Sequence, residues 1–146
     1  MDKWAEHFPE YSILKFDAVD RNELPIDHTN VMMCMGDKFV VICFDSIKDI
    51  SQKNALNQTF QQTGKEVIEI DFDQMEHFAG NMLQICSTGG EVLLVLSQQA
   101  YDCLTEAQIA KLEQYNRLIV CDISIIETTA GGSARCMMAE IYLQAR

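Results

Sequence analysis

Basic residues are scarce in this chain. Its 11 lysines and arginines stand against 22 aspartates and glutamates, which gives a formal net charge of −11 at pH 7. Because the phosphates of nucleic acids and of anionic lipids repel such a chain, we expect no nucleic-acid partner and no membrane partner. The same acidic excess favours a cationic ligand.

Long hydrophobic runs are also missing. The longest, residues 39–44 and 92–96, are far shorter than the roughly 20 apolar residues that cross a bilayer, and the first residues do not have the pattern of a signal peptide. We therefore expect a cytoplasmic protein. Apolar residues make up 48% and charged residues 23% of the 146 positions, which is typical of a single folded domain over residues 1–146.

The sequence lacks the short motifs of metal and cofactor sites. It has no C-x-x-C pair, no H-E-x-x-H and no glycine-rich phosphate-binding pattern, so we expect no metal and no cofactor. The six cysteines are expected to be free thiols, because a cytoplasmic location disfavours disulfides. Most of them lie in apolar segments and fit as small core residues, whereas Cys136 stands apart.

What the chain does contain is an internal repeat. A step of 51 residues places Asn30 on Asn81, residues 41–44 on residues 92–95, and Asp20 on Asp71 and then on Asp122. Each match is weak alone, and the shared offset carries the argument. Chance alignment of strands of similar composition is the alternative.

Each repeat predicts strand, tight turn, strand, helix, strand, and therefore an α/β fold built of ββαβ units of about 51 residues. The first unit is expected to have strands at 28–35, 38–44 and 67–71 and a helix at 49–62; the second, strands at 81–86, 91–96 and 117–122 and helical stretches over 98–115, broken at Thr105. Fragments at 12–18 and 133–143 flank them. Because incomplete arrays leave strand edges and apolar faces unpaired, we expect self-association or a second chain.

The most distinctive segment for chemistry is residues 128–136. Gly131 and Gly132 form a small, flexible stretch that leads to Arg135 and Cys136. A glycine-rich loop lets a ligand approach the backbone closely, and a neighbouring positive charge favours a thiolate, which suits a nucleophile. A hairpin loop that enters a core strand, with Cys136 as filler, explains the residues equally well.

A thiolate nucleophile needs a proton donor and acceptor, and the chain has three histidines. His7 lies in a charged amphipathic opening segment and fits a solvated helix. His77 ends a short possible helix, where it could cap or pack. His28 begins the expected strand, in which His28 and Asn30 would share one face, so it is the leading candidate.

Three strings resemble the amidinotransferase superfamily, whose members modify guanidino groups and include arginine deiminases and dimethylarginine dimethylaminohydrolases. They are PIDHTNVMMC at 25–34, HFAGNML at 77–83 and GGSARCMMAEI at 131–141. The citrulline-utilisation hydrolase-like branch is the most similar, and the resemblance covers essentially the whole chain. It implies the C-terminal portion of a pentein, a five-fold α/β propeller of ββαβ units around a central site.

The resemblance also implies roles for five residues. Cys136 matches the nucleophile that attacks the guanidinium carbon and forms a covalent thiouronium, and His28 matches the general acid/base. Asn30 stands where the family often has a carboxylate, and an uncharged amide should bind a guanidinium more weakly. Arg135 and Asn81 are further candidates for substrate binding, the substrate being a guanidino small molecule such as arginine.

The family places further carboxylates in an N-terminal half, and no part of this sequence matches them. Because a guanidinium is normally held through its N–H groups by carboxylates, we expect the chain to be incomplete alone, and active only as a homo-oligomer or as a complement to an N-terminal half. A catalytically inactive pentein remnant that serves as an oligomeric scaffold is the alternative. An unrelated small binding module, with only structural cysteines, is a third.

Overall fold

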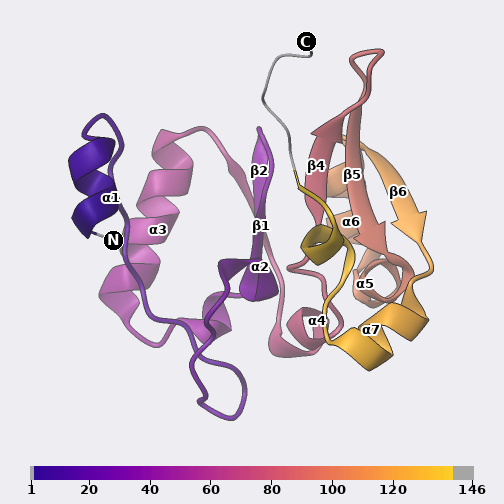
Figure 1. Ribbon diagram of the computed structural model, residues 1–146, viewed down its shortest axis with the longest axis horizontal. Coiled ribbons are helices and arrows are strands. Elements are labelled where there is room, and N and C mark those ends of the chain that lie inside the picture. The colour runs from indigo at the N-terminus through magenta and orange to yellow at the C-terminus, as the bar shows by residue number, and fades with distance from the viewer. Residues whose placement is uncertain (1, 140–146) are drawn as a thin grey trace.

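The computed structural model describes residues 2–139, and its elements form two successive units (Figure 1). The first unit and its leader comprise α1 (Asp2–His7), α2 (Thr29–Met32), β1 (Met33–Met35), β2 (Phe39–Ile42), η1 (Phe44–Ser46), α3 (Ile50–Gln62) and β3 (Glu66–Glu69). The rest comprises α4 (Phe72–Glu76), β4 (Leu83–Cys86), β5 (Val92–Ser97), α5 (Gln98–Cys103), α6 (Glu106–Glu113), β6 (Arg117–Cys121), α7 (Ser124–Ala130) and η2 (Ala134–Met137).

The two sheets have the same topology. In each, the first two strands pair antiparallel and the last two pair parallel, in the orders β1-β2-β3 and β4-β5-β6. The predicted ββαβ repeat is therefore confirmed. Cys34 pairs with Val41, and Ile85, 51 residues after Cys34, pairs with Leu93, 52 residues after Val41. The second strand is thus offset by one residue from the predicted alignment, because the second hairpin has one residue more.

Polar caps fix where the helices start. Asp49 accepts hydrogen bonds from the backbone N–H groups at the start of α3, and Thr105 forms a capping box with Gln108 at the start of α6. The predicted helix at 49–62 and the break at Thr105 are both confirmed. Asp71 caps α4. Asp122 accepts the Ser124 N–H at the start of α7, but it lies one residue before the N-cap residue of that helix, Ile123.

The predicted strand at 28–35 is wrong in its first half. The segment forms the single turn α2 before β1 begins at Met33. Gly80 packs directly against this turn: a Cβ atom placed on Gly80 would lie 2.5 Å from the backbone oxygen of Val31. Tertiary packing of the turn on Gly80 overrides the strand-like alternation of the local sequence, so His28, Asn30 and Cys34 do not share one strand face.

The flanking fragments also differ from the expectation. Residues 12–18 contain no strand, and only an isolated bridge joins Val19 to Pro25. The expected fragment at 133–143 begins with the short helix η2, and its residues 140–143 lie outside the described part of the chain. Residues 12–18 and 133–139 pair with no strand of the described part of the chain, so no sheet holds them extended.

Helix α6 joins the two sheets. It packs on β6, while Tyr115, just after it, stacks on Phe39 of β2 with ring centroids 5.9 Å apart and donates a hydrogen bond to Glu66 of β3 at 2.8 Å. The hydrogen bond that Tyr115 donates to Glu66 raises the pKa of the Tyr115 hydroxyl, and burial and the negative charge of Glu66 raise it further. The first strands of the two sheets, β1 and β4, lie side by side (Figure 1).

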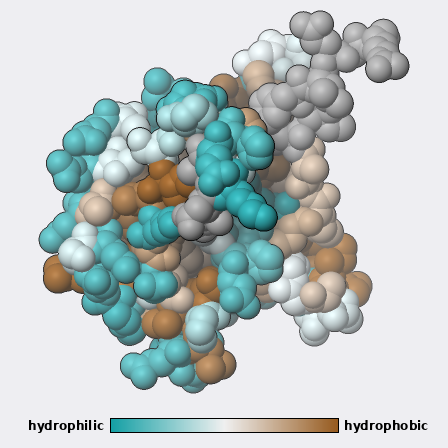
Figure 2. Space-filling model, turned by 60° about the vertical axis from the view of Figure 1, so that its left-hand side comes forward, coloured by the Kyte–Doolittle hydropathy of each residue, from teal (hydrophilic) through white to brown (hydrophobic). Residues whose placement is uncertain are grey.

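One face of the molecule is largely polar. Figure 2 shows a face on which hydrophilic side chains predominate and hydrophobic ones are scattered among them. The acidic composition agrees with this surface. Within the described residues, no helix has the length and apolar character that would let it span a bilayer.

The close approach at Gly80 generates a stability prediction. Gly80→Ala should lower the free energy of unfolding by about 2 kcal/mol, because the new methyl group must push the α2 backbone away. Gly89→Ala is the matched control, since its Cβ atom would meet only the Ser87 hydroxyl at 3.7 Å. Urea unfolding followed by circular dichroism measures both; equal effects of the two substitutions would contradict the packing argument.

Candidate active site

The thiol of Cys136 lies on a tight turn at the end of the chain's described part. Helix α7 ends at Gly131, whose φ of +67° is the left-handed conformation that glycine adopts freely. The turn then folds back closely, since a Cβ atom on Gly132 would lie 3.5 Å from the Cys136 sulfur. Cys136 sits in η2, its N–H donates to the Ser133 carbonyl at 3.0 Å, and it is exposed.

Two asparagines from the two repeat units meet at this sulfur. The Asn81 Nδ2 atom lies 3.3 Å from Cys136 Sγ, and the Asn30 Nδ2 atom lies 3.8 Å from it. Asn81 Nδ2 also donates to the Asn30 carbonyl at 2.9 Å. These are the asparagines that the 51-residue step aligns, so the repeat brings equivalent amides together on one thiol.

The amide of Asn81 also holds the turn that carries the thiol. Its oxygen accepts the backbone N–H of Arg135 at 3.1 Å, while the side chain of Ser133, the N-cap residue of η2, makes no capping bond. Asn81 thus caps η2 from another unit. Because Asn81 is buried and its polar atoms contact Asn30, Arg135 and Cys136, it acts on the protein itself in this structure.

The side chain of Arg135 lies near β1. Burial raises the pKa of the Cys34 thiol to about 12, and the nearby positive charge of Arg135 opposes that shift. Arg135 is half-buried and forms no ion pair with any acidic side chain of the described residues. Its charge is therefore not neutralised by this part of the chain.

His28 is on the same segment as Asn30 but is not joined to the thiol. It is exposed, occupies the N-cap of α2 and makes no side-chain hydrogen bond within the described residues. The other histidines lie elsewhere: His7 is exposed in α1, and the ring of His77 contacts the Asp73 carbonyl at 2.7 Å at the end of α4. The structure thus brings Cys136, Asn30, Asn81 and the backbone of Arg135 together, with His28 two residues from Asn30.

All six cysteines are free thiols. Burial raises the pKa of three of them, Cys34, Cys43 and Cys103, the last to about 11, and so keeps these thiols protonated and unreactive near neutral pH. Cys136 is exposed, so reagents in solvent can reach it. Among residues 2–139, no group of three or more His, Cys, Asp or Glu side chains could hold a metal ion.

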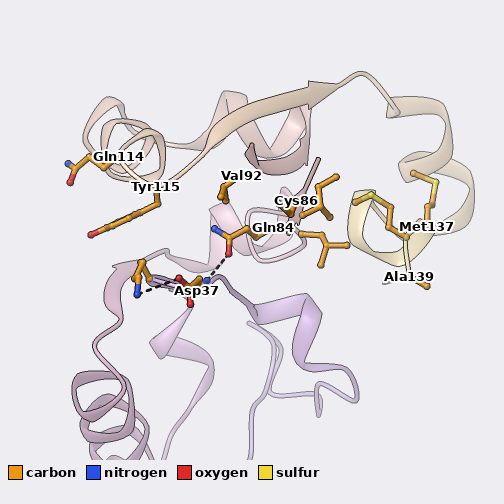
Figure 3. Close-up of a pocket in the computed structure, with 12 residues that line it drawn as sticks. Asp37, Gln84, Cys86, Val92, Gln114, Tyr115, Met137 and Ala139 are labelled. Atoms are coloured by element: carbon orange, nitrogen blue, oxygen red, sulfur yellow. Dashed lines mark hydrogen bonds and ion pairs between the residues drawn. The ribbon is translucent and has the colours of Figure 1, made fainter. Parts of the chain in front are cut away.

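A groove of about 1040 Å³ adjoins the site, since Met137, next to Cys136, forms part of its wall. Figure 3 shows Tyr115 and Gln114 at one end, Met137 and Ala139 at the other, and Gln84 between them, where its amide oxygen accepts the Asp37 N–H at 2.7 Å. Its volume matches that of small-molecule sites, which are roughly 300–1,000 Å³. No motif in the sequence pointed to this groove, because its walls come from segments far apart in the chain.

The comparisons with known proteins agree with this fold. Residues 1–143 match the family model described as N,N dimethylarginine dimethylhydrolase, eukaryotic. No curated protein matches the chain. Among solved structures, the chain is similar to the apo structure of ArgZ, an arginine dihydrolase from the ornithine-ammonia cycle in cyanobacteria, with a TM-score of 0.66 and 11% sequence identity.

That likeness covers 93% of this chain and 20% of the ArgZ chain. At this identity it shows a shared fold alone, and the predicted partial pentein is confirmed by it. The two ββαβ units do not close into a ring.

Proposed function

Because the chain belongs to the N,N-dimethylarginine dimethylhydrolase family of the pentein superfamily, we propose that it hydrolyses, or helps to hydrolyse, the guanidino group of arginine or a substituted arginine. The observation that carries the proposal is the Cys136 sulfur, exposed on its turn and faced by the amide N–H groups of Asn81 and Asn30. Donors directed at the sulfur stabilise a thiolate more than a thiol, and the thiolate is the nucleophile.

The proposed reaction has two steps. The Cys136 thiolate attacks the guanidinium carbon, a C–S bond forms, and a C–N bond breaks as the departing amine or ammonia takes a proton from the His28 imidazolium. This leaves a covalent thiouronium. His28 then takes one proton from water, whose oxygen attacks the same carbon. The C–S bond breaks as the remaining hydroxyl proton passes to solvent, and the ureido product and the thiolate are released.

Two further residues are proposed to bind the substrate. The side-chain amide oxygen of Asn30 can accept a hydrogen bond from a guanidinium N–H, although it lacks the negative charge of a carboxylate. The guanidinium of Arg135, which has no acidic partner among the described residues, would bind a substrate carboxylate. Asn81 contributes by holding the turn and the thiol, as its buried amide already does.

The site described so far contains little negative charge. Within residues 2–139, no acidic side chain is hydrogen-bonded to Cys136, Asn30 or Asn81. A guanidinium held by amides alone binds weakly. We therefore propose that a second chain, either another copy or an N-terminal half, supplies the missing carboxylates. A catalytically inactive scaffold is the second candidate function, and the same shortage of carboxylates favours it.

We propose that another copy packs on the second sheet. On the first sheet, Cys34, Val41 and Ile68 are fully buried on the face that Phe39 turns to the second unit. On the equivalent face of the second sheet, Ile85, Leu93 and Ile119 are only half-buried and are not part of the hydrophobic core of the described residues. A further unit packed on this face would bury it as the second unit buries the first.

The hydrolase proposal is tested by turnover. The purified chain should convert arginine or N,N-dimethylarginine to a ureido product, measured colorimetrically, slowly alone and at least tenfold faster with an added N-terminal half of a homologue. Cys136→Ala should abolish the product in both cases, and Cys86→Ala, which removes the other exposed thiol, should not. If no product forms, either with the chain alone or with the added N-terminal half, the hydrolase proposal is refuted and the inactive scaffold remains as the candidate function.

The packing proposal is tested by oligomeric state. Light scattering after size-exclusion chromatography should give a multiple of the 16.6 kDa chain mass, and Leu93→Lys should reduce it to one chain by placing a charge on the apolar face. Ile50→Lys is the matched control, an exposed apolar residue at the start of α3 on the other unit. A wild-type mass of 16.6 kDa would contradict self-association.

A further inference from the structure

Glu127 is the one acidic side chain of the described residues that is buried, with 6% of its surface exposed in α7. Burying a carboxylate is costly unless hydrogen bonds compensate for the lost water. Here the Ser133 hydroxyl, itself fully buried, donates to Glu127 Oε1 at 2.6 Å. This hydrogen bond gives the buried carboxyl group a polar partner in place of water.

This pair closes the loop that carries the thiol. The Glu127 backbone carbonyl accepts the Gly131 N–H at 3.3 Å, and its carboxylate accepts the Ser133 hydroxyl, so a single residue holds both sides of the Gly131–Gly132 bend. The Ser133 carbonyl in turn accepts the Cys136 N–H at 3.0 Å. Two hydrogen bonds in series therefore link the buried carboxylate to the backbone of Cys136.

Ser133 donates its hydroxyl to Glu127 and does not use it to cap η2. A serine at a helix N-cap normally accepts a hydrogen bond from the first turn, but the Ser133 side chain makes no capping bond, and the Arg135 N–H goes to Asn81 instead. Two contacts thus hold the loop: the hydrogen bond from Ser133 to Glu127 and the hydrogen bond from the Arg135 N–H to Asn81. Without the bond to Glu127, the thiol would no longer be held against the amides of Asn81 and Asn30.

We infer that Glu127, acting through Ser133, is a positioning residue for the Cys136 thiol, an inference that rests on the proposed role of Cys136 as nucleophile. Glu127 makes no hydrogen bond to Cys136, Asn30 or Asn81 and has no part in the bond-making steps. Its function is to set the path of the loop, so that the sulfur meets its two N–H donors.

The test is the pH profile of alkylation of Cys136 by iodoacetamide in the full chain, followed by peptide mass spectrometry, with the exposed Cys86 as internal reference. In Glu127→Ala and in Ser133→Ala, alkylation of Cys136 at pH 7 should slow about tenfold relative to Cys86, because the loop no longer holds the sulfur against its two N–H donors. Glu127→Gln should fall between these and the wild type, because its amide oxygen still accepts the Ser133 hydroxyl.

Thr129→Ala is the matched control, since it removes a hydroxyl of α7 that bonds only to the helix backbone, and it should leave the profile unchanged. A lower melting temperature without a changed Cys136 profile in Ser133→Ala and Glu127→Gln would show that the pair only stabilises the fold, and would overturn the inference. Because alkylation needs no substrate turnover, failure of the hydrolase assay alone would count against the proposed function and not against this positioning role.

Discussion

The site depends on the hydrogen bonds made by the side-chain amide of Asn81. It donates to the carbonyl of Asn30 and toward the Cys136 sulfur, and it accepts the N–H of Arg135. One buried side chain thus ties the first unit, the second unit and the turn that follows α7. An aspartate of the same shape would have no N–H to donate and would place a negative charge beside the sulfur, so the amide is the chemistry that this position requires.

Two further contacts hold Asn81 and the Cys136 thiol close together. Gly80, directly before it, lets the chain pass against the α2 turn, where a methyl group would collide with the Val31 carbonyl. From the opposite side, Glu127 and Ser133 hold the Gly131–Gly132 bend. The Cys136 thiol is therefore held both by contacts between segments that are about 50 residues apart and by the local hydrogen bond from Ser133 to Glu127.

The sequence predicted the units better than the site. The repeat, the cap at Asp49 and the break at Thr105 depend on local pattern and were recognisable for that reason. The turn at Thr29–Met32 was mistaken for a strand, because its conformation depends on Gly80 about fifty residues later. The 51-residue match of Asn30 and Asn81 was visible, but that the two amides meet on one sulfur follows only from packing. The hydrogen bond from Ser133 to Glu127 has no sequence motif, because a sequence does not distinguish a buried glutamate from an exposed one.

Selective reactivity of Cys136 toward a substrate-like electrophile tests the account most directly. 2-Chloroacetamidine, a small cation that resembles a guanidinium, should alkylate Cys136 well ahead of the other five thiols at neutral pH, as read by peptide mass spectrometry. Cys34, Cys43 and Cys103 have raised pKa values and are protonated there, and within residues 2–139 no pair of side-chain amides faces Cys86 or Cys121. Equal labelling of Cys86 and Cys136, or no labelling of Cys136, would contradict the central claim that this turn presents a nucleophile.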